Sequence, residues 1–169
     1  MRDVLVRDPL RLELEWRAGE LWHVDLDWAA KDGEEDSVRQ SPFAGEAAAF
    51  FRAWARGDPP GTFPFPLAWH RAGGFARRVL TVLADRVGRG QWISYSGLAR
   101  LCGVPRGARA VGRVMGANPW PIVIPCHRVL RSDGGIGGFS SGIELKRYLL
   151  SLEEVAPALS GRARGSAVG

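Results

Sequence analysis

Residues 122–130 read Ile-Val-Ile-Pro-Cys-His-Arg-Val-Leu, a buried-strand pattern that is interrupted at its centre. Branched apolar residues on both sides are typical of a well-packed strand, and Pro125 makes a rigid corner between them. The corner presents Cys126 beside His127 and Arg128. A cysteine in such a place can be a passive small hydrophobe. Because an adjacent imidazole and positive charge favour the thiolate, we interpret Cys126 as a reactive thiol that titrates below the ~8.5 of a free thiol.

The N-terminal third of the chain predicts a small sheet covered by one helix. Apolar residues occupy the even positions of 10–16 and again of 22–28, and a polar turn separates the two runs. This alternation predicts a hairpin with one apolar face, which includes Trp22. Ser41 offers an N-cap for an amphipathic helix that covers the hairpin. A proline-rich connector over 58–66 then separates two lobes.

Two short helices are predicted in the second half of the chain. Ser94 caps the first, over 95–101, and a glycine-containing turn leads to the second, over 107–117. This spacing is typical of a helix-turn-helix, whose second helix meets DNA, although two helices joined by such a turn also occur as plain structure. The second helix is rich in arginine and in small residues, which let a backbone approach a partner closely. A turn over 132–135, a glycine-rich loop over 136–142 and a helix over 143–152 are expected near the cysteine.

Charge is distributed unevenly along the chain. The net charge is +5, but residues 1–65 carry 8 basic and 13 acidic side chains, or −5, and residues 66–169 carry 15 basic and 5 acidic, or +10. The C-terminal part is therefore suited to a polyanion. An arginine-rich surface is also typical of a GC-rich or heat-adapted source, so charge alone leaves both explanations open.

The composition argues against several other classes of protein. The chain has no apolar run long enough to span a bilayer and no leader pattern at its start, so we expect a soluble, cytoplasmic protein. Two cysteines, Cys102 and Cys126, are too few for a disulfide framework. The three histidines and two cysteines show no paired ligand spacing, and we therefore expect no metal and no other cofactor.

Several motifs between about Phe75 and Glu153 occur together. Residues 125–129 read Pro-Cys-His-Arg-Val, and a glycine-rich turn follows them. The other motifs are Ile93-Ser94-Tyr95, Ala108-Arg109-Ala110-Val111-Gly112, Asn118-Pro119 and Leu145-Lys146. In this combination the chain resembles the O(6)-alkylguanine-DNA alkyltransferases, also called methylated-DNA-protein-cysteine methyltransferases.

The resemblance implies an α+β fold. Residues 1–65 would form a small N-terminal lobe of a sheet plus a helix, of the ribonuclease H-like kind. Residues 66–154 would form a mostly helical catalytic and DNA-binding domain with a winged-helix-like helix-turn-helix motif. Residues 155–169 are small, polar and basic, and are predicted to be a disordered tail. The family also implies a monomer, and the structural zinc of some relatives is not expected here because the N-terminal half has no cysteine.

The family's activity would make this protein a methylated-DNA-[protein]-cysteine S-methyltransferase that acts once. It would move the alkyl group of O(6)-alkylguanine in DNA, with O(4)-alkylthymine as a second candidate substrate, irreversibly to Cys126. By resemblance, His127 is the general base, acting through a water, and Glu153 orients its imidazole. Glu154 stays an alternative to Glu153, because helix register cannot be read from sequence to one residue. Asn118 is implied to lock the turn that leads to the active-site strand.

The resemblance further implies that the protein binds double-stranded DNA in the minor groove and extrudes the damaged base. Arg109 would fill the vacated stack, and Tyr95 would contact the backbone phosphate and the flipped base. The other DNA-binding residues would be Ala108, Gly112, Arg113 and Met115. The substrate pocket would be lined by Tyr95, Pro121, Val129, Phe139 and Ser140.

Three other functions fit parts of the pattern. Alkyltransferase-like sensors bind alkylated bases without repairing them, but they lack the reactive cysteine that this chain has. A helix-turn-helix regulator usually dimerises, and no dimer helix is evident. A thiol hydrolase usually brings its cysteine and histidine from separate elements, whereas Cys126 and His127 are adjacent. DNA repair is therefore the expected function, with the preferred size of the alkyl group left open.

Overall fold

The computed structural model of the 169-residue chain describes residues 1–30, 38–39, 41–58, 61–155 and 166–168. The chain divides into two compact units, Met1–Trp69 and His70–Gly169. The predicted boundary between residues 65 and 66 lies just before this division. Strands and helices occur in both units, which confirms the predicted α+β class. No helix in the described part of the chain is long and apolar enough to cross a membrane.

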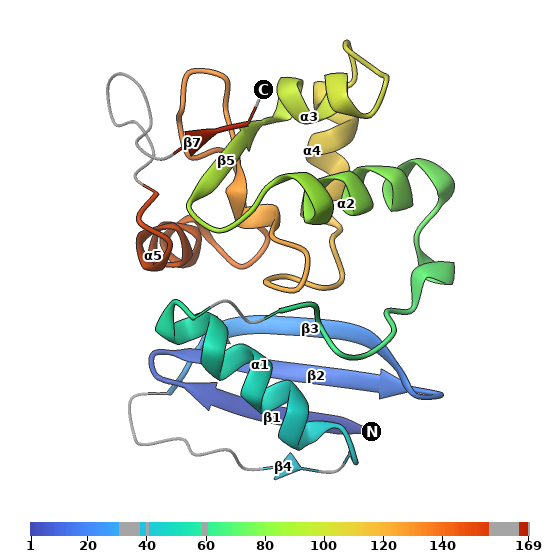
Figure 1. Ribbon diagram of the computed structural model, residues 1–169, viewed down its shortest axis with the longest axis vertical. Coiled ribbons are helices and arrows are strands. Elements are labelled where there is room, and N and C mark those ends of the chain that lie inside the picture. The colour runs from blue at the N-terminus through green and yellow to red at the C-terminus, as the bar shows by residue number, and fades with distance from the viewer. Residues whose placement is uncertain (31–37, 40, 59–60, 156–165, 169) are drawn as a thin grey trace. The chain divides into compact units, whose positions relative to one another are not determined.

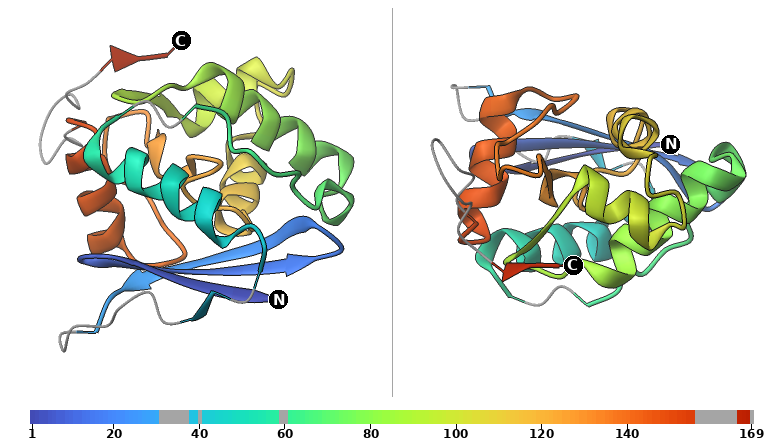
Figure 2. Two further views of the ribbon diagram at one scale, coloured as in Figure 1. Left: turned by 60° about the horizontal axis from the view of Figure 1, so that its bottom comes forward. Right: turned by 90° about the horizontal axis from the view of Figure 1, so that it is seen from above.

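The first unit is an antiparallel sheet with one helix on its face (Figure 1). Its strands are β1 (Arg2–Arg7), β2 (Leu10–Arg17), β3 (Glu20–Trp28) and β4 (Val38–Arg39), in the order β3-β2-β1-β4. The alternation of apolar residues predicts the β2–β3 hairpin, which is confirmed, but not β1 or β4. Helix α1 (Ala44–Arg56) lies across the sheet, as Figure 2 shows from a second side.

A β-bulge changes which residues of the hairpin face the core. The register shifts between Glu15 and Trp16, so that Trp16 pairs with Leu21. A bulge of this kind turns the side chains beyond it to the opposite face. Leu21 is buried as a result, while the ring of Trp22 is half-buried and lies 4.1 Å from the Arg17 guanidinium carbon. The prediction that Trp22 belongs to the apolar face is therefore wrong.

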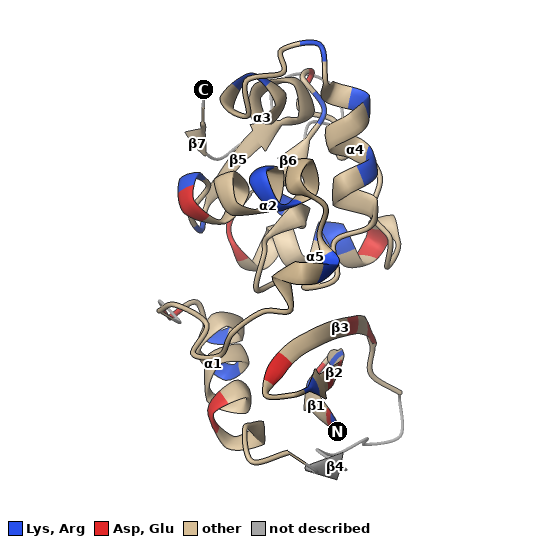
Figure 3. Cartoon of the chain, turned by 90° about the vertical axis from the view of Figure 1, so that its right-hand side faces the viewer, with Lys and Arg blue, Asp and Glu red and all other residues tan. Residues whose placement is uncertain are grey.

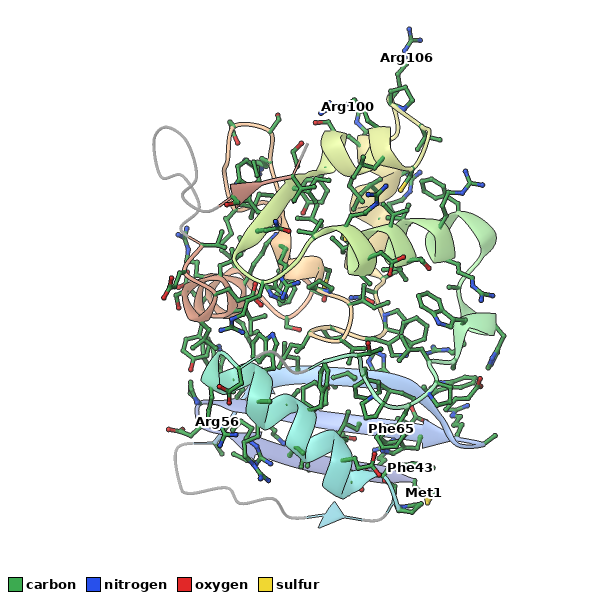
Figure 4. All side chains as sticks on the ribbon, viewed as in Figure 1. Met1, Phe43, Arg56, Phe65, Arg100 and Arg106 are labelled. Atoms are coloured by element: carbon green, nitrogen blue, oxygen red, sulfur yellow. The ribbon has the colours of Figure 1, made fainter. Side chains whose placement is uncertain are left out.

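The core of the first unit is aromatic and contains one buried carboxylate. Trp16 lies 4.9 Å from Phe43 and 5.2 Å from Phe65, measured between ring centroids. Figure 4 labels Phe43 and Phe65. Asp3 is fully buried and accepts hydrogen bonds from the Trp16 indole, at 2.7 Å, and from the backbone N–H of Ser41, at 3.0 Å. The Ser41 hydroxyl also bonds to Asp3. Helix α1 consequently begins later than predicted, after Phe43 and without a side-chain cap.

The second unit is mostly helical and contains a small parallel sheet. Its elements are α2 (Gly74–Arg86), β5 (Gln91–Ser94), α3 (Tyr95–Leu101), α4 (Ala108–Gly116), η2 (Cys126–Arg128), β6 (Val129–Leu130), α5 (Ile143–Leu152) and β7 (Ser166–Ala167), and the 3-10 turn η1 (Trp69–Arg71) precedes them. The sheet order is β6-β5-β7. The predicted disordered tail, 155–169, falls mainly outside the described residues. Its described part forms β7, which the sequence does not predict, and the N–H of Val168 donates to the Trp92 carbonyl at 2.8 Å.

Helices α3 and α4 are joined by a tight turn. The Ser94 hydroxyl accepts the N–H of Gly97 at 2.9 Å, which confirms the predicted N-cap of α3. The N–H of Gly107 donates to the Val104 carbonyl at 2.7 Å just before α4 begins. A Cβ at Gly107 would lie 2.8 Å from that carbonyl oxygen, so the turn requires glycine. Helix α4 packs against both α3 and α2.

Only the end of the stretch 122–130 is a strand. Val129–Leu130 form β6, Cys126–Arg128 form the 3-10 helix η2, and the residues before Pro125 form a turn. Ile122 adopts a φ of +72°, and the N–H of Ile124 closes the turn on the Trp120 carbonyl at 2.8 Å. The strand predicted before Pro125 is wrong, because a strand ladder loses a donor at each proline in this region.

Candidate active site

Cys126 begins η2 and is held from the side by Asn118. The Asn118 amide donates to the Ile124 carbonyl at 2.9 Å, and its side-chain oxygen accepts the N–H of Trp120 at 3.1 Å. The Asn118 side chain also acts to lower the pKa of Cys126. One buried amide thus joins the two ends of the turn that precedes the thiol, and Cys126 is only 3% exposed. The expectation that Asn118 locks this turn agrees with these contacts.

The Cys126 thiol is not a preformed thiolate. Burial raises its pKa, and the opposing effects of Asn118 and of the Lys146 charge do not outweigh burial. The prediction of a thiol that titrates below its usual range is therefore wrong for the free protein. The sequence shows that His127 and Arg128 are adjacent to Cys126, but it does not show the burial of the thiol, which raises its pKa. The thiol must lose its proton during the reaction, which requires a base.

His127 supplies an imidazole that is neutral in its resting state. The residue is fully buried, and its Nε2 atom lies 3.1 Å from Oε1 of Glu153. Burial lowers the pKa of His127 even though the Glu153 carboxylate acts to raise it. Glu153 follows the last residue of α5, whereas Glu154 has a φ of +59° and is exposed. Of the two candidates, Glu153 is the residue that contacts His127.

Arg128 completes a buried cluster with these two residues. Its Nε and Nη2 atoms each donate to a different oxygen of Glu153 at 2.8 Å, and Nη1 donates to the Val87 carbonyl at 2.7 Å. Burial works to raise the pKa of the Glu153 carboxyl, but three effects hold it below the usual range: the charge that His127 carries when it is protonated, the hydrogen bonds of His127 and Arg128, and the Arg128 charge. Sequence reasoning treated Arg128 only as a positive charge beside the thiol, and it missed these contacts because the partners of Arg128 come from the distant ends of α2 and α5.

Lys146 is a second functional candidate that the sequence reasoning missed. It is fully buried, and its Nζ donates to the Val129 carbonyl at 2.6 Å and to the Gly138 carbonyl at 3.2 Å. Burial lowers the pKa of Lys146 to about 8, although the nearby Cys126 acts to raise it. The sequence could have indicated its burial, because Lys146 lies at helical spacing from Leu149 and Leu150 on the apolar face of α5. A lysine on an apolar face is rarely buried unless it has partners.

A cavity of about 420 Å³ opens beside the cysteine. Among the described residues it is lined by Tyr95, Gly112, Met115, Gly116, Cys126, Gly138, Phe139 and Ser140. Tyr95, Phe139 and Ser140 were expected there. Pro121 and Val129 were also expected, but they are buried and do not belong to this lining. A side chain at Gly137 would come within 2.9 Å of the Tyr95 hydroxyl, so glycine lets the loop close over the cavity wall.

The surface next to the cavity is basic. In Figure 3 the blue segments, which mark Lys and Arg, lie along α4 and in the turn before it. Arg109 and Arg113 are exposed, and Arg100 and Arg106 point away from the core of the unit in Figure 4. Ala108 and Gly112 are half-buried on the same helix. Met115, which was also expected to bind DNA, is buried and lines the cavity.

The chemistry of this site is nucleophilic. The Cys126 thiol lies at the wall of the cavity, and His127 follows it in the chain. The His127 imidazole contacts Glu153, which is in turn held by its ion pair with Arg128. Within the described residues no group of three His, Cys, Asp or Glu side chains is placed to hold a metal ion. The arrangement can deprotonate the thiol and direct it at an electrophile bound in the cavity.

Comparisons with known proteins match both the sequence and the fold. The family described as 6-O-methylguanine DNA methyltransferase, DNA binding domain, matches residues 74–155. Methylated-DNA–protein-cysteine methyltransferase of Methanosarcina barkeri is 37% identical over 119 residues, which cover 70% of this chain and 73% of the relative. The human protein of the same name is 47% identical over 94 residues, covering 54% of this chain and 45% of the relative. The chain thus spans about half the length of the mammalian relatives it matches.

Solved structures agree with these matches. A crystal structure of Mycobacterium tuberculosis OGT in complex with DNA superposes with a TM-score of 0.73 and 29% identity, covering 89% of this chain and 91% of that one. The O6-methylguanine-DNA methyltransferase of Pyrococcus kodakaraensis gives a TM-score of 0.70 with 28% identity, covering 89% of this chain and 96% of that one. The similarity therefore extends over both units of the fold.

Proposed function

The chain belongs to the methylated-DNA–protein-cysteine methyltransferase family, and on that premise we propose that it repairs O(6)-alkylguanine in DNA by taking the alkyl group onto Cys126. The observation that carries the proposal is the position of the Cys126 thiol at the wall of a 420 Å³ cavity, backed by the buried His127–Glu153 pair. O(4)-alkylthymine is a second candidate substrate. We propose that the protein acts as a monomer.

The transfer is a single displacement. His127, acting through a water, takes the Cys126 proton, and the resulting thiolate attacks the alkyl carbon. A carbon–sulfur bond forms as the bond from carbon to guanine O6 breaks. The electron pair passes to the guanine ring, which takes the proton back from His127 and leaves as ordinary guanine. The product is a thioether, which has no good leaving group, so each molecule acts once.

Two charges make this displacement feasible in a buried site. The Lys146 ammonium favours the developing thiolate, because its charge acts to lower the pKa of Cys126. The Glu153 carboxylate stabilises the imidazolium that His127 becomes while it holds the proton. A thiol with a raised pKa is compatible with this scheme, because the thiolate needs to exist only while the substrate fills the cavity and excludes water.

Access to the base requires DNA to be opened. We propose that α4 enters the minor groove, that Arg109 occupies the gap left by the extruded base, and that Tyr95 contacts the phosphate and the flipped base. Ala108, Gly112 and Arg113 would face the DNA backbone. The main-chain carbonyls of Cys126 and Val129, the Tyr95 hydroxyl and the Ser140 amide would read the guanine. The Val129 carbonyl already binds Lys146, but its oxygen has a second lone pair for the base.

Intact-mass spectrometry tests this function directly. Incubation with an oligonucleotide that contains O(6)-methylguanine should add one methyl group per protein molecule, and peptide mapping should place it on Cys126. Cys126→Ala should stay unmodified, and Cys102→Ala should react like the unsubstituted protein. Repeated turnover with no mass change, or a methyl group on Cys102 alone, would refute the proposal.

A further inference from the structure

Glu153 occupies a position that is unfavourable for a negative charge. It follows the last residue of α5, where the helix dipole places partial negative charge, and it is only 3% exposed. A carboxyl group in such a place would ordinarily be neutral unless a cation compensates it. The ionisation of Glu153 therefore depends on which neighbour supplies the positive charge.

Within the described part of the chain, the charged and titratable groups near the His127–Glu153 pair include Arg128 on η2, Cys126 at the start of η2, Lys146 on α5 and Arg89 before β5. His127 and Cys126 are neutral at rest because burial opposes their charged forms. Lys146 directs its ammonium to two carbonyl oxygens, and Arg89 donates to the Leu152 carbonyl. Arg128 contacts both carboxylate oxygens directly.

Arg128 is suited to this task by its chemistry and its anchoring. A guanidinium stays protonated at any pH the protein survives, and its planar fork matches the two oxygens of a carboxylate. Its third contact, from Nη1 to the Val87 carbonyl at 2.7 Å, ties the fork to the end of α2. The guanidinium is thus fixed from one side by backbone and presents two donors to Glu153 on the other.

The charge of Glu153 decides which nitrogen of His127 carries a proton. An ionised carboxylate can only accept hydrogen bonds, so the neutral imidazole must place its N–H on Nε2, the atom 3.1 Å from Oε1. Nδ1 then keeps the lone pair that acts as the base. We propose that Arg128 is a positioning residue, which keeps Glu153 a hydrogen-bond acceptor and thereby makes Nδ1 the basic nitrogen of His127. Its use in alkyl transfer rests on the proposed function, but the proton placement exists in the free protein.

Without the Arg128 charge, the His127–Glu153 pair can adopt either of two protonation states, and in neither of them can Nδ1 of His127 act as a base. A protonated Glu153 would donate to Nε2, and the ring proton would then sit on Nδ1. Alternatively, Glu153 would keep its charge by drawing a second proton onto the ring, and the imidazolium would carry protons on both nitrogens. In either state Nδ1 is protonated and cannot accept a proton from the thiol or its bridging water.

Nitrogen NMR of the imidazole rings tests the proton placement without DNA. The chain has only three histidines, so the His127 signals can be assigned by comparison with His127→Gln. In the unsubstituted protein at neutral pH, Nε2 should be protonated and Nδ1 unprotonated. In Arg128→Met, Nδ1 should become protonated. An unprotonated Nδ1 in folded Arg128→Met would overturn the proposal.

A second measurement does not depend on whether Arg128→Met folds. In His127→Gln the imidazole is gone but Arg128 remains, and the carboxyl carbon of Glu153 can be followed by NMR after assignment with Glu153→Gln. If Arg128 holds the charge, Glu153 should titrate no higher than the ~4.3 of a free glutamate. A midpoint above that value would mean that His127 supplied the charge, and the proposal would fail.

Kinetic controls separate this role from simple packing. Arg128→Lys keeps one positive charge, and should retain the Nε2–H form and recover most of the transfer rate that Arg128→Met loses. Arg147→Met removes an exposed cation from α5 and should change neither the tautomer nor the rate. A lysine variant that behaves like the methionine variant would contradict a role for charge. Absence of alkyl transfer in the unsubstituted protein, with the expected tautomer intact, would refute the proposed function alone.

Discussion

The two units of the chain bury polar groups in different ways. Among the described residues, the first unit buries one charged side chain, Asp3, which accepts hydrogen bonds from an indole, a backbone N–H and a hydroxyl. The second unit buries His127, Arg128, Lys146 and Glu153, and within this group the charges of Arg128 and Glu153 compensate each other. A single buried carboxylate held by hydrogen bonds helps to specify a fold, whereas several ionisable groups buried together shift one another's pKa values and can do chemistry.

The largest effect should come from Glu153→Gln, because it leaves the Arg128 guanidinium buried without its counter-charge. Removing one partner of a buried ion pair typically lowers the free energy of unfolding by about 3–5 kcal/mol, and urea-induced unfolding would measure this loss. The pKa of Glu153 is depressed in the folded state, so its contribution is present above the ~4.3 of an unfolded glutamate and is lost as pH falls below it. The difference in unfolding free energy between Glu153→Gln and the unsubstituted protein should therefore be smaller in acid than at neutral pH. A loss of less than about 1 kcal/mol of unfolding free energy would contradict the view that Glu153 compensates the buried charge of Arg128.

Asp3→Asn should have a smaller effect of a different kind. The amide keeps one acceptor for the Trp16 indole but presents donors to a backbone N–H or hydroxyl that also donates, at a cost of about 1–3 kcal/mol of unfolding free energy. Alkyl transfer by the folded variant, measured in a single turnover, should be unchanged. If alkyl transfer by Asp3→Asn were slowed as much as transfer by Glu153→Gln, the assignment of a structural role to the Asp3 network and a chemical role to the Glu153 network would be wrong.

Lys146→Met should slow transfer by about tenfold, or ~1.4 kcal/mol of activation free energy. The Lys146 charge acts to lower the pKa of Cys126, so removing it should move the pH midpoint of iodoacetamide labelling upward. In the unsubstituted protein this midpoint should already lie above the ~8.5 of a free thiol, because burial raises the pKa of Cys126. Arg147→Met, which changes an exposed neighbour on α5, is the control and should leave the midpoint in place.

The smallest effect concerns the surfaces of the two units. Arg109→Ala should slow repair of duplex DNA roughly fivefold more than repair of a flexible single strand, because an inserted side chain offsets part of the few kcal/mol that base extrusion costs. Arg56→Ala, on the acidic first unit, should change neither rate. Equal slowing of both substrates by Arg109→Ala would make Arg109 an ordinary phosphate contact and weaken the minor-groove proposal.

Sequence patterns predict those helices, strands and caps that are determined by residues within the same short segment. Helix α5, the Ser94 cap of α3 and the β2–β3 hairpin follow from periodicity and capping chemistry, and all three are confirmed. The apolar run before Pro125 was predicted to be a strand, and it failed because burial of Ile122 and Ile124 is achieved by a covered turn. Apolar composition reports burial, but it does not distinguish a strand from such a turn.

The site was predictable where one motif holds it and not where distant segments meet. Cys126 and His127 follow from five consecutive residues, whereas the contacts of Arg128 join the ends of α2 and α5 to η2. The choice between Glu153 and Glu154 depended on how α5 ends, which sequence cannot give to one residue. The raised pKa of Cys126 was missed for a related reason, since desolvation depends on everything packed around the thiol.

Ile122 reverses the usual expectation for tolerance to substitution. At most buried positions glycine is among the most damaging replacements, since truncating a core isoleucine costs about 2–5 kcal/mol. At a φ of +72°, however, a β-branched residue carries a backbone strain of order 1–3 kcal/mol that glycine does not. The two contributions oppose each other at this residue. Variation at 122 should therefore be tolerated better than its burial suggests, with glycine and asparagine, which adopt this conformation readily, as the least costly exchanges.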